Sequence, residues 1–545
     1  MIAIIKTFLA SKNLYPKLAL ALGGGMLMGL TPAPVEAFPL AWIALVPLWL
    51  LLADCTLKQS VIFALIWGLA YHGLALFWIT GIHPMTWLGV PWLASLAIAA
   101  FCWLFISLWG AALVIAWALG MFSLRKLKLK ARSKKFLLQK GFFAPFQRVL
   151  IGVAWWCLLE AIWSSGVLWW TSLSYTQSPH NLLILQLARF SGPTTVTAAI
   201  VAVNGLIAEF IYQKVKHLRD TSPLSGREEL KERAANSILA AALSLLLSSH
   251  AIGWAIYARP ITQENPIKIG IVQGNIPNNI KLFTDGFQRA MQRYTSGYEA
   301  LADRGVDAVL TPEGALPVFI DRLQDTPIYA AILKHKTLAW LGAYGREPDN
   351  PTALSYTNSL FTVTGQGNAV SRFDKIKLVP LGEYIPFEPI VGKFIDRLSP
   401  LEAHMIPGKT SQVFETPLGK ASVGICYESA FAEHFRRQTA RGGEFILTAS
   451  NNAHYAKSMP AQHHAQDVMR AIENDRWAAR ATNTGYSGIV NPHGSTIWRS
   501  GIKTYEVHAD TIYRRKTRTL YVRFGDWLLG VLIILAVLSL LGFSM

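Results

Sequence analysis

The first half of this chain contains seven apolar segments long enough to cross a lipid bilayer, and an eighth lies at the C-terminus. A membrane-spanning helix needs about 20 predominantly apolar residues. Hydrophobic residues make up 52% of the chain and charged residues only 15%. A polytopic α-helical membrane protein is therefore predicted. The eight segments are 18–36, 38–53, 59–79, 89–118, 149–169, 191–212, 237–257 and 526–544.

The first segment has a second interpretation. Basic residues precede it, and Val35-Glu36-Ala37 near its end resembles a cleavage site, so it could be a signal peptide. Cleavage there would leave the orientation of the later segments unchanged.

The net charge of +18 is concentrated in short polar segments. Residues 125–148 hold nine Lys and Arg and no acid, the N-terminal stub holds three lysines, and residues 213–236 hold six bases against four acids. The positive-inside rule places all three in the cytoplasm, so residues 258–525 lie on the far side of the membrane. Basic loops of this kind contact anionic lipid headgroups, and we expect no nucleic-acid partner.

A region of different composition follows the seventh segment. Between residues 258 and 525 the apolar runs have the length of strands, and helical patterns at 286–303 and 461–480 lie among them. This alternation is typical of an α/β sandwich. We expect a transmembrane bundle over 1–257, an α/β domain over 258–525 and a C-terminal transmembrane helix over 526–545. The strand-like runs are 267–273, 306–311, 338–343, 358–364, 421–426, 444–449 and 486–490.

Reactive side chains follow three of these strands, at positions where α/β folds assemble chemistry. Glu313 lies in TPEGALP, Lys375 and Glu383 lie in FDKIKLVPLGEY, and Cys426 ends ASVGIC two places before Glu428. Each has an ordinary explanation when taken alone. A cysteine can be a small buried hydrophobe, and a charged turn residue can be solvated.

The combination of these residues favours a nucleophilic thiol at Cys426. A free thiol outside the cytoplasm is prone to oxidation, so its presence suggests that it is used. Acyl chemistry needs a base, which Glu313 could supply, and donors for an oxyanion, which Lys375 and the Tyr427 N–H could supply. The other cysteines all lie in or beside apolar segments, at Cys55, Cys102 and Cys157.

The order Glu, Lys, Cys in these contexts resembles the nitrilase superfamily, as does RAIENDRWAARATNTGYSGIVNPHG at 470–494. An extracytoplasmic nitrilase-like domain between seven spans and one is similar to the apolipoprotein N-acyltransferase family. TPEGALP, KIKLVPLGEYIP, GICYE and LTASNNAHYAKS fall where that family has its motifs. The resemblance covers essentially the whole chain and implies an αββα sandwich carried by the bundle.

The resemblance implies that Glu313 is the general base, Lys375 the oxyanion stabiliser and Cys426 the nucleophile. Glu383 would orient the lysine or assist the base, and Tyr427 with its neighbour Glu428 would shape the pocket. It also implies a reaction in two steps. The thiol takes an acyl chain from a membrane phospholipid, and the α-amine of an S-diacylglyceryl cysteine at the start of an apolipoprotein then accepts it.

The resemblance also implies an enzyme of the bacterial cytoplasmic (inner) membrane, with its catalytic domain on the periplasmic side, and we expect a monomer. No cofactor is expected. We expect no metal either, because three candidate histidines lack the spacing of a ligand set and thiol partners. They are His454, His463 and His464.

Residues 384–406 form an apolar connection that could be a lid excluding water from a thioester, or a loop packing on its own domain. The lid candidates are Tyr384, Phe387 and Phe394. The chain departs from the family pattern at four positions that bear on the lipid pocket rather than on the triad. The family usually has His, Asp, Trp and an aromatic residue where this chain has Lys377, Asn452, His454 and Leu282.

Two rival functions remain open. A membrane-anchored amidase would use the same triad and pass its acyl group to water, whereas a membrane scaffold or transporter would leave the domain inert. Glu160, inside the fifth apolar segment, is a second functional candidate because ionisable groups are rare in spans. A structural hydrogen bond across the bundle is its alternative interpretation.

Overall fold

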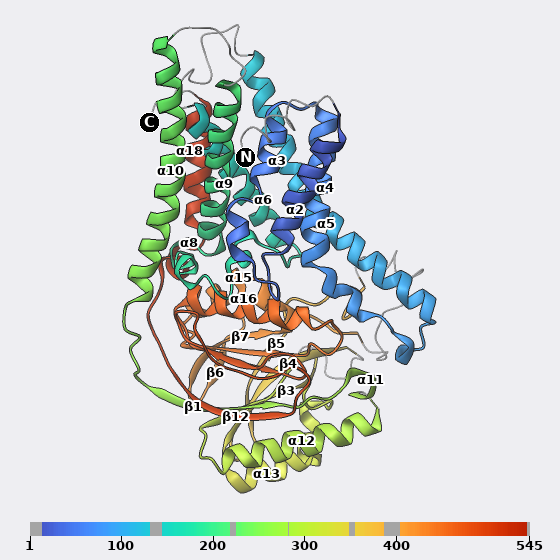
Figure 1. Ribbon diagram of the computed structural model, residues 1–545. Helices are drawn as coiled ribbons and strands as arrows, with labels where there is room; N and C mark the ends of the chain where they lie inside the picture. The colour runs from blue at the N-terminus through green and yellow to red at the C-terminus, as the bar shows by residue number, and fades with distance from the viewer. Residues whose placement is uncertain are drawn as a thin grey trace.

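The computed structural model describes residues 13–130, 144–217, 225–281, 283–347, 355–385 and 404–541. A bundle of apolar helices forms one half of the molecule and an α/β domain forms the other, with the first and last described residues in the bundle half (Figure 1). The main helices of the bundle are α2 (Tyr15–Gly29), α3 (Val46–Ala53), α4 (Leu57–Ala75), α5 (Trp92–Lys130), α6 (Ala144–Ser165), α9 (Pro193–His217), α10 (Ser225–Tyr257) and α18 (Trp527–Leu540).

Four helices in the described residues are long and apolar enough to cross a membrane, which is fewer than the eight spans predicted. They are Trp92–Arg125, Ala144–Ser165, Pro193–Lys216 and Glu232–Tyr257. Shorter apolar helices cover Phe38–Ala53, Leu182–Ser191 and Trp527–Leu540.

The predicted span 38–53 shows why apolar content overestimates the length of a helix. It is broken into a 3₁₀ turn, η1 (Phe38–Trp42), and the eight-residue α3, each with a proline in its first turn. Proline lacks an N–H and ends the helix before it. At 1.5 Å per residue, α3 is about 12 Å long, well short of a bilayer core of about 30 Å.

Two six-stranded sheets form the α/β domain. One has the order β12-β1-β2-β3-β4-β5 and the other β11-β10-β9-β8-β7-β6. The first contains β1 (Pro266–Gln273), β2 (Ala308–Leu310), β3 (Leu338–Arg346), β4 (Tyr356–Val363), β5 (Ala369–Asp374) and β12 (Glu506–Tyr513). The second contains β6 (Phe414–Thr416), β7 (Gly419–Ile425), β8 (Phe445–Ser450), β9 (Ala478–Thr482), β10 (Gly488–Val490) and β11 (Thr496–Arg499).

The two sheets pack face to face over an apolar core that includes Ile269 and Trp340 from one and Val423 and Leu447 from the other. Helices α12 (Thr284–Ala302) and α13 (Pro327–His335) cover the outer face of the first sheet, and α16 (Ser458–Asn474) lies between the second sheet and the bundle (Figure 1). A further helix, α15 (Ala432–Ala440), packs on β7. The layers are those of the predicted αββα sandwich.

All seven predicted strands are present, and five more are found at β5, β6, β9, β11 and β12. The predicted helix 461–480 ends at Asn474, because Asp475 takes a left-handed conformation with φ of +54°. Strand β9 follows, and its Arg480 is buried and paired with Asp467. The strand was not predicted because the buried Arg480 interrupts its apolar pattern.

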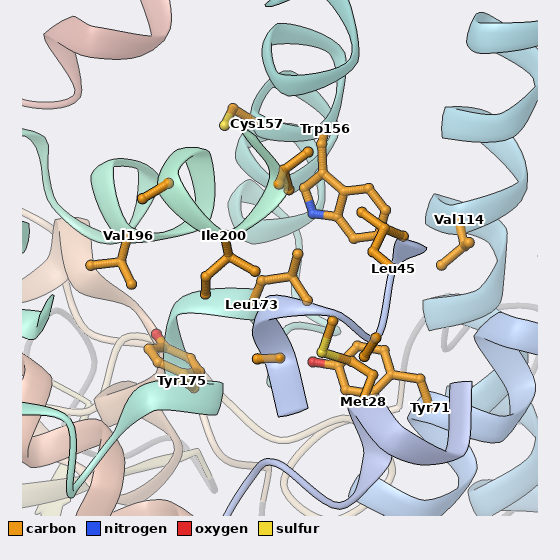
Figure 2. Close-up of a cluster of buried hydrophobic side chains, with 14 of the residues drawn as sticks. Met28, Leu45, Tyr71, Val114, Trp156, Cys157, Leu173, Tyr175, Val196 and Ile200 are labelled. Atoms are coloured by element: carbon orange, nitrogen blue, oxygen red, sulfur yellow. The ribbon is translucent and has the colours of Figure 1, made fainter. Parts of the chain in front are cut away.

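The bundle has its own apolar core, in which side chains from α2, α4, α5, α6 and α9 meet (Figure 2). Met28, Tyr71, Val114 and Trp156 lie in it, and Cys157 packs at its edge. Cys157 is buried. Its surroundings are those of a packing residue.

Glu160 is buried in the same part of the bundle and is fully engaged in hydrogen bonds. It accepts them from Trp156 Nε1 at 3.1 Å, Ser172 Oγ at 2.8 Å, Leu173 N–H at 2.9 Å and Thr197 Oγ1 at 3.0 Å. These donors come from α6, from α9 and from the segment around η5 (Leu173–Gln177). The carboxyl group ties those segments together, which favours the structural interpretation of Glu160.

Candidate active site

Three strand ends bring the predicted reactive side chains together. Glu313 lies in the turn after β2, Lys375 directly follows β5, and Cys426 directly follows β7. Lys375 Nζ is 3.0 Å from Glu313 Oε1, and the Cys426 thiol and the Glu313 carboxyl each shift the pKa of the other. The three residues are 1%, 8% and 7% exposed, for Lys375, Glu313 and Cys426 in turn. The two sheets therefore join a carboxylate, an ammonium and a thiol in one buried group.

The Glu313 carboxylate accepts hydrogen bonds on both oxygens. Oε1 accepts from Asn358 Nδ2 at 2.7 Å as well as from Lys375, and Oε2 accepts from the Asn451 N–H at 2.9 Å. Burial alone would raise the pKa of Glu313, but the charge and hydrogen bond of Lys375, together with the charge of Lys281, leave that pKa below its ordinary value. The group is therefore an anion at neutral pH and is able to receive a proton.

The Lys375 ammonium lies between two carboxylates. Its Nζ is 2.6 Å from Glu383 Oε1, and the other oxygen of Glu383 accepts the Val379 N–H at 2.8 Å. Burial lowers the pKa of Lys375, but the charges of Glu313 and Glu383 raise it well above its ordinary value. Lys375 therefore stays protonated and presents a fixed positive charge to the site.

Cys426 has an unusual backbone conformation, with φ of +54° at the junction of β7 and the 3₁₀ turn η7 (Cys426–Ala430). Residues other than glycine adopt this conformation at a cost, and it recurs at functional sites. His463 Nε2 donates a 2.7 Å hydrogen bond to the Cys426 carbonyl and holds the peptide there. Burial raises the pKa of the thiol to about 12, so the thiol is neutral and needs a base to become a nucleophile.

Known proteins match this chain over nearly its full length. The family model of the apolipoprotein N-acyltransferase N-terminal domain matches residues 24–206, and that of the carbon-nitrogen hydrolases matches residues 268–518. The apolipoprotein N-acyltransferase of Nostoc sp. is 53% identical over 95% of this chain and 97% of its own. The chain belongs to the apolipoprotein N-acyltransferase family.

Two further relatives with the same name agree. That of Synechocystis sp. is 47% identical over 94% of this chain and 98% of its own, and that of Thermosynechococcus vestitus is 40% identical over 93% and 92%. The chain is therefore an enzyme, an acyltransferase, and the predicted nitrilase-like domain is confirmed by the carbon-nitrogen hydrolase match.

The side chain of Tyr427, the residue after the thiol of this acyltransferase, contacts the bundle. Its hydroxyl is 2.6 Å from the Val167 carbonyl oxygen and accepts the Trp169 N–H at 2.9 Å. Its ring stacks on Trp170, with the ring planes 4° apart and the centroids at 6.1 Å. The residue after the cysteine thus joins the α/β domain to the segment that follows α6.

Glu428 is fully buried, and both of its carboxylate oxygens accept backbone N–H groups. Its Oε1 accepts the N–H groups of Ile376 at 2.6 Å and Lys377 at 3.0 Å, and its Oε2 accepts the N–H of Ile425 at 2.8 Å. It therefore ties the segment after Lys375 to the end of β7.

The lid candidates are only partly within the described residues. Tyr384 is half-buried, and its carbonyl accepts the Leu381 N–H at 2.8 Å. Phe387 and Phe394 lie outside the described residues, as does Leu282.

The remaining departures from the family pattern make contacts with neighbouring polar and aromatic side chains. Lys377 Nζ lies 4.7 Å from the centre of the Phe431 ring, and Asn452 Nδ2 is 3.1 Å from His463 Nδ1. His454 contacts Asn278. Among the described residues, no group of three or more His, Cys, Asp or Glu is arranged to hold a metal ion.

Sequence reasoning missed three residues that contact Glu313: Asn358, Asn451 and Lys281. Asn451 directly follows β8, and Lys281 ends the short helix α11 (Asn278–Lys281) after β1. The rule that reactive groups follow strands could have found both. Asn358 lies within β4, and its polar side chain in a buried strand was the only sign in the sequence that it could contact the site.

Proposed function

We propose that this chain transfers a fatty acyl chain from a membrane phospholipid to the N-terminal α-amine of an S-diacylglyceryl cysteine in apolipoproteins. A thioester on Cys426 would be the intermediate. The observation that carries the proposal is the single buried group formed by a neutral thiol, an anionic Glu313 and a cationic Lys375. The relatives from Nostoc sp. and Synechocystis sp. are named apolipoprotein N-acyltransferases, which supports an apolipoprotein acceptor.

In the first step, Cys426 Sγ attacks the ester carbonyl carbon of the phospholipid while its proton passes to Glu313. The oxygen that becomes negative is stabilised by the Lys375 ammonium, whose charge is in place before the reaction. The C–O bond then breaks, and the departing lysophospholipid oxygen takes the proton from Glu313. A thioester remains on the enzyme.

In the second step, the neutral α-amine of the lipidated cysteine attacks the thioester carbon and gives a proton to Glu313. The C–S bond breaks, the proton returns to the sulfur, and an amide is released. Both substrates are anchored in lipid, so the site works at the membrane surface. Excluding water protects the thioester, and we assign a lid role to Tyr384 with Phe387 and Phe394.

We infer that the chain crosses the bacterial inner membrane about eight times, with 38–53 as a proline-interrupted span, and acts as a monomer. Residues 1–257 would form the bundle, 258–525 the periplasmic catalytic domain and 526–545 the last span. The strongly basic segment 125–148 supports a cytoplasmic position for that loop. Helix α16 faces the bundle, which supports a site close to the membrane.

The lid role is tested by replacing both phenylalanines with serine in the chain reconstituted in bilayers. We expect acyl transfer to the lipoprotein to fall about threefold to tenfold at an unchanged melting temperature, because water that reaches the thioester hydrolyses it before the amine can attack. Unchanged kinetics would contradict the lid role.

The transfer is tested by mass spectrometry of lipoprotein N-termini from cells that carry the wild-type chain or Cys426→Ala as their sole enzyme of this class. We expect the third acyl chain to be present with the wild type and absent with the variant. Release of free fatty acid without acylated lipoprotein would instead favour the amidase. A third acyl chain that persists in the variant would contradict the proposal.

A further inference from the structure

Lys281 is a second lysine buried beside the triad. It is 7% exposed, and its Nζ donates a hydrogen bond to the Glu313 carbonyl at 3.3 Å. That carbonyl is the only acceptor recorded for this ammonium within the described part of the chain. Gly314 has φ of +52°, and a Cβ there would lie 3.3 Å from Lys281 Nζ. The glycine thus leaves room for the ammonium against the turn that carries Glu313.

The charged and titratable groups around Lys281 come from several strand ends. Glu313 after β2 and Cys426 after β7 act on it electrostatically, and Lys281 in turn acts on His454. Lys375 contacts the Glu313 carboxylate and pairs with Glu383, and Tyr344 of β3 faces Gly314. Burial lowers the pKa of Lys281 to about 8, although Glu313 and Cys426 raise it.

Stability does not explain an ammonium in this position. A buried charge with one long hydrogen bond costs folding free energy, and an apolar side chain of similar length would avoid that cost. The charge has a use in the site, however, because a cation near Glu313 favours its ionised form. Proteins retain such unfavourable groups where activity requires them.

We propose that Lys281 is a positioning residue, whose ammonium holds the turn that carries Glu313 and supplies a second positive charge that keeps this carboxylate ready to take the Cys426 proton. The inference rests on the proposed function, in which Glu313 is the base. Lys281 acts through Glu313.

The test measures the rate at which iodoacetamide alkylates Cys426 across pH, by peptide mass spectrometry of the full-length chain. The variants are Lys281→Met, Lys281→Arg and a control, Lys334→Met, whose side chain on α13 is 71% exposed. We expect the acidic limb of the Lys281→Met profile to move up by about one pH unit, so that alkylation there is about tenfold slower. Lys281→Arg and the control should follow the wild type, and Lys281→Met should melt at the same or a higher temperature.

An unchanged profile in folded Lys281→Met would overturn the inference. Loss of folding in that variant would overturn it too, because Lys281 would then be structural. Failure of the proposed function has a different signature: the profiles would shift as expected, yet no thioester would form from phospholipid in the wild type.

Discussion

Two regions of this molecule each bury a glutamate and a cysteine, and only one of them is arranged for chemistry. In the bundle, Cys157 and Glu160 lie one turn apart on α6, and the carboxyl group accepts four hydrogen bonds from neutral donors. In the α/β domain, Glu313 faces the ammonium groups of Lys375 and Lys281.

The comparison teaches that the donors, rather than the burial, separate the two carboxylates. Neutral N–H and O–H groups donate hydrogen bonds to both carboxyl oxygens of Glu160, and these bonds link three segments of the bundle. Two ammonium groups around Glu313 instead keep a negative charge beside a thiol that has a proton to lose. A buried acid next to a cysteine is therefore weak evidence for a catalytic site. Cations beside the acid make that evidence stronger.

Replacement of the two cysteines should give the largest contrast. Cys426→Ala removes the nucleophile, and we expect transfer to fall by about 10⁴-fold or more. Cys157→Ala should leave transfer unchanged and lower the free energy of unfolding by about 1 kcal/mol, since a small buried side chain is truncated. Turnover on phospholipid and a thermal melt check both. An active Cys426→Ala enzyme would remove the distinction between the regions.

Replacement of the two glutamates should show the second-largest contrast. Glu313→Gln loses the base, and we expect transfer to fall about 10²- to 10⁴-fold. Glu160→Gln loses acceptor capacity for buried donors and should cost about 1–3 kcal/mol of stability with little change in the transfer rate per folded molecule. Rates normalised to folded protein distinguish the two effects. A reversed pattern would assign the chemistry to the bundle.

Glu383→Gln should sharpen the role of Lys375. Glu383 is one of two carboxylates that raise the pKa of Lys375, so its neutralisation lowers that pKa. The stabilisation from protonated Lys375 is present below the ordinary lysine pKa and is lost as pH rises through the raised value. In the variant the pKa of Lys375 is lower, so this stabilisation is lost at a lower pH. We expect about tenfold slower transfer and a basic limb that moves to lower pH. Glu415→Gln, at an exposed ion pair with Lys420, is the control.

Tyr427→Phe should give the smallest effect, at the junction of the two regions. It removes the hydroxyl that contacts Val167 and Trp169, and we expect about 1 kcal/mol less stability and a fewfold slower transfer. Tyr505→Phe, a partly exposed hydroxyl in the α/β domain, is the matched control. Equal behaviour of the two variants would show that the junction does not position Cys426.

The grouping of the three reactive side chains was easier to predict from the sequence than the breaks in the bundle helices. Glu313, Lys375 and Cys426 follow strands whose apolar runs are easily recognised, so their convergence could be expected from the rule for α/β folds. The break within 38–53 was not predicted, because hydropathy counts apolar residues and ignores the prolines that interrupt the helix. Lys281 was missed because its helix is one turn long, and β9 because Arg480 interrupts its apolar pattern.

The most direct test of the account is the intact mass of the chain after incubation with a phospholipid and no acceptor. The account predicts that the wild type gains the mass of one acyl chain, released by hydroxylamine and mapped to Cys426, and that Cys426→Ala and Glu313→Gln gain none. An acyl group on another residue, or an equal gain in Cys426→Ala, would contradict it.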